Sequence, residues 1–141
     1  MASAVKYNQF IEDLCNKVHD LFGTTDTLRV ALTNAAPNVS THAVRTDITE
    51  LSTGNGYTSG GVDVQNDATR SGGTVTMTSV DATITASGGA IGPFRYAVLF
   101  NDTPSSPADP LICYWDLGSN VTLNDGDALN IDFGASLATF A

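Results

Sequence analysis

The chain has 141 residues, a formal net charge of −9 at pH 7 and a pI near 4.2. With 42% hydrophobic and 15% charged residues, its composition is that of a globular chain long enough to bury a core. The acidic balance excludes a typical nucleic-acid-binding protein, because that function requires a basic surface. The apolar runs are far shorter than the roughly 18 residues of a membrane-spanning helix, so we expect no membrane partner.

Residues 1–23 are predicted to form an amphipathic helix, because their apolar residues recur at the spacing of one helical face. Ser3 is a candidate cap, and Gly23 suits the position after the last turn. The segment lacks the apolar core of a secretory signal, so we expect synthesis in the cytoplasm. The apolar face consists of Tyr7, Phe10, Ile11, Leu14, Val18, Leu21 and Phe22.

From residue 24 onward the hydrophobic period changes to the two-residue period of strands. Short strands separated by Gly, Pro and Asn turns predict seven or eight strands in an antiparallel β-sandwich or jelly roll. We therefore expect a single mainly β domain over residues 1–141, with the helix packed on a sandwich that spans 24–141. The expected segments are strands at 27–34, 92–102 and 111–118, two strands with a bend at 72–89, a hairpin at 120–133, and a strand or short helix at 41–51.

The segment 92–102 is apolar on both faces, which is typical of a central strand. Alternation predicts Phe94, Tyr96, Val98 and Phe100 on one face and Ala97 and Leu99 on the other. Arg95 lies in the middle of this strand, and a charge enclosed there needs a partner. We expect Arg95 to pair with an acidic neighbour.

The stretch "TGNGYTSGG", residues 53–61, contains Gly54, Gly56, Gly60 and Gly61 around Tyr57. A phosphate-binding loop would open into a helix and would follow a dinucleotide or P-loop spacing. Neither condition is met, so the glycines are predicted to serve a sharp turn that needs positive φ, with the Tyr57 ring packed over it.

Other candidate sites are weak. Asn124–Asp127 resembles the start of a calcium loop but lacks the closing glutamate, and a two-residue turn accounts for the Asp-Gly pair as it stands. His42 is the only candidate general base for a hydrolase, without a nucleophile motif beside it. We therefore expect no catalytic residues, no metal and no cofactor. Cys15 and Cys113 are predicted to be two buried free thiols rather than a disulfide.

Charge is distributed unevenly along the chain. Arg95 is the last basic residue, and six aspartates follow it. Such an acidic half either keeps the protein soluble or docks on a basic partner surface, and the sequence leaves both interpretations open.

The order of these segments resembles a family of small virion proteins of tailed bacteriophages. The resemblance runs from Thr25 to Phe133 and rests on the glycine-rich turn, the "RYAV" strand, the Pro-rich loop and the "LICYWDLG" strand. The positions that carry it are Gly54, Gly56, Tyr57, Gly60, Gly61, Arg95, Tyr96, Ala97, Val98 and Asp116.

This resemblance implies a non-enzymatic structural protein, and we favour a capsid decoration (cement) protein. Its expected location is the capsid surface of the virion, after synthesis in the bacterial host. The expected partners are the major capsid protein and further copies of the chain in a dimer or trimer. A tail, neck or fibre component with a receptor- or glycan-binding role is the alternative.

Because Tyr114 and Trp115 are adjacent, one of them should face outward, and Trp115 is an interface candidate if it does. The candidate interface residues are Phe10, Leu14, Phe22, Arg95 and Trp115.

Overall fold

The computed structural model describes residues 3–22, 25–134 and 136–140. It is mainly β, with 46% strand and 8% helix, which confirms the predicted antiparallel β class. The elements are β1 (Val5–Lys6), α1 (Asn8–Cys15), β2 (Leu28–Thr33), the 3₁₀ helix η1 (Arg45–Asp47), β3 (Val62–Asp63), β4 (Asp67–Ser71), β5 (Thr74–Thr78), β6 (Ala82–Thr85), β7 (Ile91–Asn101), β8 (Leu111–Leu123), β9 (Ala128–Ile131) and β10 (Ala138–Phe140).

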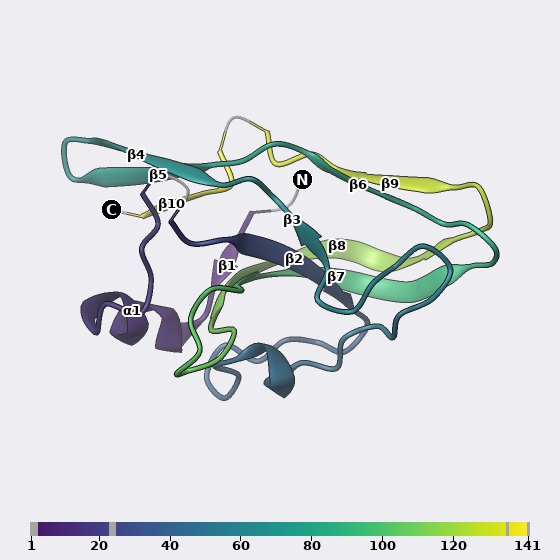
Figure 1. The fold of residues 1–141 in the computed structure, drawn as a ribbon, viewed down its shortest axis with the longest axis horizontal. Coiled ribbons are helices and arrows are strands. Elements are labelled where there is room, and N and C mark those ends of the chain that lie inside the picture. The colour runs from purple at the N-terminus through teal and green to yellow at the C-terminus, as the bar shows by residue number, and fades with distance from the viewer. Residues whose placement is uncertain (1–2, 23–24, 135, 141) are drawn as a thin grey trace.

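The strands form three antiparallel sheets. A five-stranded sheet has the order β1-β8-β7-β2-β3, a three-stranded sheet the order β10-β5-β4, and β6 pairs with β9. The two smaller sheets lie end to end in one layer over the five-stranded sheet, and the chain between β2 and β3 runs along its opposite face (Figure 1). No helix in the described part of the chain is long and apolar enough to cross a membrane.

Both faces of the five-stranded sheet are buried along β2, the second half of β7 and the first residues of β8. Leu28, Val30 and Leu32 of β2 lie on one face, as predicted, in a core shared with Met77 and Ile131 of the smaller sheets. A second apolar cluster on the other face consists of Tyr7, Ala31, Ile48, Val98, Phe100 and Leu111. Burial on both sides explains why β7 is apolar at successive positions.

The predicted faces of β7 are wrong at Phe94. This residue packs in the core with Ala97 and Leu99, not with Val98 and Phe100. The register between β7 and β8 shifts twice between Ile91 and Tyr96. A β-bulge adds a residue to one strand and so reverses which side chains face the core, which simple alternation does not anticipate.

The helix is much shorter than predicted, because α1 begins at Asn8 and ends at Cys15. Lys17 adopts a φ of 61°, and the N–H groups of Lys17 and Val18 donate to the carbonyls of Leu14 and Asp13. This is a Schellman motif, which closes a helix with a left-handed residue. The predicted cap Ser3 lies before β1, and Gly23 lies outside the described residues.

The segment Asn124–Asp127 forms a tight turn, in which the Asp127 N–H donates to the Asn124 carbonyl at 2.8 Å. The predicted hairpin is nevertheless wrong, because β8 pairs with β1 and β7 whereas β9 pairs with β6. The turn therefore carries the chain from one layer to the other. A turn sequence specifies the local bend but not which strands pair beyond it.

Candidate functional site

The glycine-rich stretch forms a two-residue turn. Gly54 and Tyr57 exchange both backbone hydrogen bonds, at 2.9 and 3.0 Å, around Asn55 and Gly56. The φ angles of Asn55 and Gly56 are 56° and 96°, the left-handed pair that an Asn-Gly turn adopts. The predicted sharp turn with positive φ is confirmed.

Two of these glycines also permit close backbone contacts. A Cβ on Gly56 would lie 2.2 Å from the carbonyl oxygen of Thr85, and a Cβ on Gly61 would lie 1.9 Å from that of Val30. Any side chain at either position would displace a strand of the core. The stretch thus fixes the loop before β3 against β2 and β6.

Tyr57, the aromatic residue of this stretch, is buried. Its side chain is 2% exposed and belongs to the main core. Its hydroxyl accepts a hydrogen bond from the Leu32 N–H at 3.0 Å and donates one to Glu50 Oε1 at 2.7 Å. Burial raises the pKa of Tyr57, and the hydrogen bond to Glu50 raises it further, so the hydroxyl remains a donor.

Glu50 connects this loop to a charged network. Its Oε1 also accepts from the Gly60 N–H, and its Oε2 accepts from Arg45 Nη1 at 3.0 Å. Arg45 Nε donates in turn to Asp109 Oδ2 at 3.0 Å. Burial alone would lower the pKa of Arg45, but hydrogen bonds and charge from both carboxylates raise it. Both carboxylate oxygens of Glu50 therefore accept hydrogen bonds from within the protein, which indicates a structural role for this residue.

Arg95 pairs with an acidic residue, as predicted. Its Nε and Nη2 donate to the two carboxylate oxygens of Asp116 at 2.8 and 2.9 Å, across the β7–β8 pair. The pair is not enclosed, because the two side chains are 38% and 39% exposed. The hydrogen bonds from Arg95 lower the pKa of Asp116, and the Gly118 N–H adds to this effect.

The remaining interface candidates occupy different environments. Phe10 is fully buried, and Trp115 is 3% exposed and packs on Phe133 with ring centroids 5.5 Å apart. Neither side chain offers surface to a partner in this conformation; of the adjacent aromatics, Tyr114 is the more exposed. Leu14 is half-buried and Phe22 is 50% exposed. Phe22 is therefore the candidate with the most available apolar surface.

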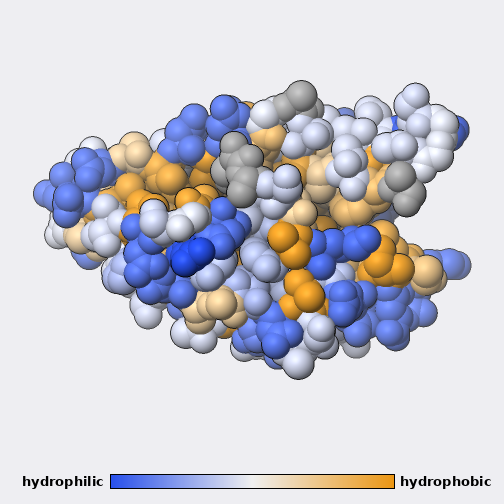
Figure 2. All heavy atoms as spheres, turned by 180° about the vertical axis from the view of Figure 1, so that it is seen from behind, coloured by the Kyte–Doolittle hydropathy of each residue, from blue (hydrophilic) through white to orange (hydrophobic). Residues whose placement is uncertain are grey.

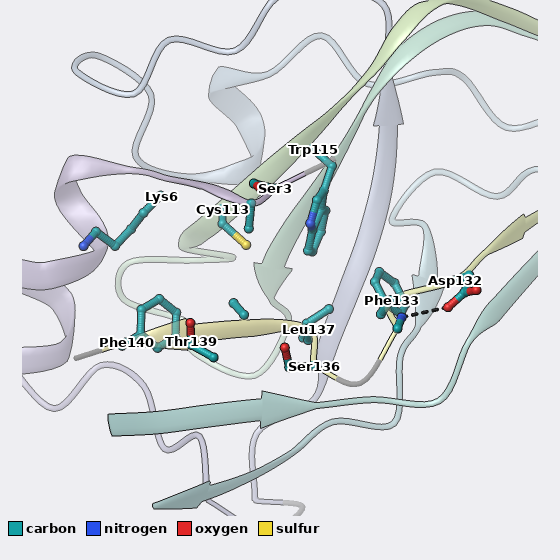
Figure 3. A pocket seen from close by; sticks show the side chains of 13 residues that line it. Ser3, Lys6, Cys113, Trp115, Asp132, Phe133, Ser136, Leu137, Thr139 and Phe140 are labelled. Atoms are coloured by element: carbon teal, nitrogen blue, oxygen red, sulfur yellow. Dashed lines mark hydrogen bonds between the residues drawn. The ribbon is translucent and has the colours of Figure 1, made fainter. Parts of the chain in front are cut away.

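A pocket of about 580 Å³ lies at the open side of the two layers, between β1 and β8 on one side and the C-terminal segment with β10 on the other. Figure 3 shows Lys6, Cys113 and Trp115 facing Leu137 and Phe140 across it. Burial raises the pKa of Cys113, so its thiol is protonated and unreactive. The same region is seen in Figure 2, where hydrophobic residues gather in the hollow between the layers.

The groups considered for catalysis and metal binding are separate from this pocket. His42 Nδ1 accepts a hydrogen bond from the Asn38 N–H at 3.3 Å. His19 Nδ1 lies 3.0 Å from the side-chain amide nitrogen of Asn101. Among the described residues, no group of three His, Cys, Asp or Glu side chains is arranged to hold a metal ion. Asp125 and Asp127, considered for calcium, accept hydrogen bonds from the N–H groups of Gly88 and Asn124.

No family model, curated protein or solved structure matches this chain.

The sequence did not indicate the Glu50 network or the pocket. Glu50 lies in a weakly patterned segment, and its partners come from four separate positions along the chain. The pocket is lined by residues from both terminal segments and by Cys113 and Trp115 of β8, which the fold brings together.

Proposed function

We propose that the protein is a structural component of a tailed-bacteriophage virion, and specifically a decoration protein that binds the outer surface of the capsid. One observation carries the proposal. The residues on which the resemblance to phage virion proteins rests are the ones that build the scaffold: Gly56 and Gly61 allow close strand contacts, Tyr57 anchors a loop, and Arg95 pairs with Asp116 across two strands. Such a framework is consistent with a protein that acts through its surface.

We further propose that the two layers form a β-sandwich of the kind found in many surface-binding proteins. The core shared by β2, β7 and β8 with β5, β6 and β9 supports this arrangement. A rigid two-layer body suits a decoration protein, because packing of the two sheets holds the surface residues in fixed relative positions.

The proposed capsid contacts combine apolar and acidic surface. Val5, Ile11, Phe22 and Val80 are 41–55% exposed, and three of them lie in the N-terminal segment. Arg45 and Arg95 are engaged by carboxylates within the chain, whereas Asp102, Asp125 and Asp132 are exposed. The acidic surplus therefore faces outward, where it complements a basic surface on the major capsid protein.

A decoration protein stabilises a capsid because many copies make the same contact across the shell. A standard interface buries about 1,200–2,000 Å² in total, and many such contacts across capsid seams together oppose shell opening. We propose a dimer or trimer for the same reason, since each oligomer then bridges several capsid subunits.

The proposal is tested with virions that lack the chain. Particles assembled without it should release their DNA at a lower temperature than wild-type particles, and adding back the purified protein should restore the wild-type temperature. A matched control is protein carrying Gly73→Ala, which alters an exposed turn residue where the added Cβ has nothing within 4 Å. Unchanged release by particles that lack the chain would contradict a cementing role.

The alternative is a tail, neck or fibre component that binds a host receptor or glycan. It predicts few copies per particle and saturable binding to host cells. Binding of the purified protein to a glycan array would favour it over the decoration protein.

A further inference from the structure

A buried polar cluster joins the end of α1 to the end of β7. Asn101 is fully buried, and Asp13, His19 and Asp26 are 4%, 9% and 6% exposed. His19 belongs to the segment 16–22 that leaves α1, and Asn101 is the last residue of β7. The cluster therefore holds the N-terminal segment on the five-stranded sheet.

The hydrogen bonds of Asn101 fix its amide orientation. Its Oδ1 accepts from the Thr103 N–H at 3.1 Å, and its Nδ2 donates to Asp26 Oδ2 at 2.6 Å. The second proton on Nδ2 therefore points at His19 Nδ1, 3.0 Å away. Nδ1 must be an acceptor, so the neutral ring carries its proton on Nε2.

Two carboxylates face His19 from the elements around it. Asp13 comes from α1 and Asp26 from the segment before β2, whereas β7 contributes the uncharged Asn101. Phe10 packs its ring on the imidazole with centroids 5.1 Å apart. Burial lowers the pKa of His19, and this effect exceeds the opposite influence of Asp13 and Asp26.

The neutral ring leaves two buried atoms unpartnered within the described residues, His19 Nε2 and Asp13 Oδ2. The other oxygen of Asp13 accepts from Gln9 Nε2 at 3.2 Å, and Asp26 Oδ2 also accepts from the Asp20 N–H at 2.8 Å. The polar atoms around Asn101 are thus all hydrogen-bonded, whereas near Asp13 two buried polar atoms lack a hydrogen-bond partner among the described residues.

We propose that His19 is an acid-sensitive latch, which holds residues 16–22 on the end of β7 while Nδ1 accepts from Asn101 and releases them when Nδ1 takes up a proton. A protonated Nδ1 faces the Asn101 Nδ2 donor, so the hydrogen bond is lost. Rotating the Asn101 amide does not repair it, because the bonds to Thr103 and Asp26 are then both broken. Release exposes more apolar surface beside Phe22.

The effect of pH on the latch follows from the coupling between proton binding at His19 and release of residues 16–22. A histidine with a lowered folded-state pKa binds its proton more readily in the released state than in the latched state. The latch is therefore fully closed above the ordinary histidine pKa of about 6.5 and weakens as pH falls below it. A one-proton difference changes the latched-to-released ratio by up to about tenfold per pH unit in this window.

The test is hydrogen exchange of the whole chain at pH 7.5 and pH 5.0, each corrected for intrinsic exchange. We expect the protection of residues 16–22 to fall at least fivefold at pH 5.0 (the one-proton limit over this interval is roughly thirtyfold), while the peptide 111–117 stays protected. Equal protection of residues 16–22 at both pH values overturns the latch. Loss of protection in both peptides together also overturns it, because that result is global unfolding.

Two variants assign the effect to His19. His42→Gln removes the other imidazole and should leave the acid response intact, whereas His19→Gln should abolish it. If His19→Gln fails to fold, nitrogen chemical shifts of the wild-type imidazole at pH 7.5 decide. A proton on Nε2 supports the latch, and a proton on Nδ1 overturns it.

Discussion

The hydroxyl of Tyr57 lies 3.0 Å from the backbone nitrogen of Leu32, 25 residues earlier in the chain, and accepts its hydrogen bond. The same hydroxyl donates to Glu50. One buried oxygen thus ties the glycine-rich loop to β2 and to the charged network around Arg45.

Removing this hydroxyl should destabilise the fold. Tyr57→Phe leaves the Leu32 N–H without a partner inside the core, and we expect the free energy of unfolding to fall by about 1–3 kcal/mol. Urea denaturation followed by tryptophan fluorescence measures the change. Tyr96→Phe is the matched control, because its half-buried hydroxyl makes no hydrogen bond among the described residues; a loss of the same size in both variants would argue against the anchoring role.

Gly61 should tolerate no side chain. In Gly61→Ala the new Cβ meets the Val30 carbonyl oxygen at 1.9 Å in a residue with φ of 68°. We expect a loss of about 3 kcal/mol or more in the free energy of unfolding. Gly72 has a φ of 59° with nothing within 4 Å, so Gly72→Ala should lose only about 1–2 kcal/mol. Equal losses would mean that backbone conformation, rather than close packing, requires Gly61.

The predictions are most accurate where the structure of a segment depends on residues close to it in the sequence. The strand at residues 28–33 and the turn at Asn55–Gly56 were predictable because alternation and an Asn-Gly pair are local signals. An acidic partner for Arg95 was predictable from the charge in an apolar strand, although nothing in the sequence specified Asp116, 21 positions away.

The errors arise where tertiary contacts override local pattern. Leu21 continues the helical spacing of α1, but it is buried beyond a chain reversal at Lys17. The short strands β1 and β10 contain two and three residues, and they are strands only because β8 and β5 pair with them. The His19–Asn101 contact joins residues 82 positions apart, so no window of sequence reveals it.

Trp115 and Phe22 should behave in opposite ways on substitution. Trp115→Ala removes a core side chain, and we expect it to lower the free energy of unfolding by about 3–5 kcal/mol. Phe22→Ala alters an exposed side chain, so its effect on unfolding should stay within about 0.5 kcal/mol, while binding to capsids weakens. Thermal unfolding and capsid co-sedimentation measure the two effects. Undiminished co-sedimentation of Phe22→Ala would remove Phe22 from the proposed interface.

The Asp116 carboxyl should titrate below the ordinary range for aspartate, because Arg95 donates two hydrogen bonds to its ionised form. The stability contributed by this lowered pKa is present above the ordinary aspartate pKa and is lost as pH falls through the folded-state value. Carboxyl carbon chemical shifts across an acid titration measure the pKa. Arg95→Gln should move the Asp116 pKa upward, and an unchanged value would mean that Arg95 does not set it.

The two thiols should differ in reactivity. Both cysteines are free, but Cys15 is exposed, contrary to the prediction of two buried thiols, while Cys113 is buried. In the folded protein we expect a thiol reagent to label one cysteine per chain quickly, and the second only after denaturation. Cys15→Ser should eliminate the fast reaction; fast labelling that persists in this variant would show that Cys113 is accessible.

The number of copies of this chain in purified virions tests the central proposal most directly. Quantitative mass spectrometry against the major capsid protein gives the ratio. A decoration protein should be present on the order of hundreds of copies per particle, in fixed proportion to the capsid subunits. A count in the tens would place the chain in the neck, tail or fibres, and its absence from virions would contradict a structural role altogether.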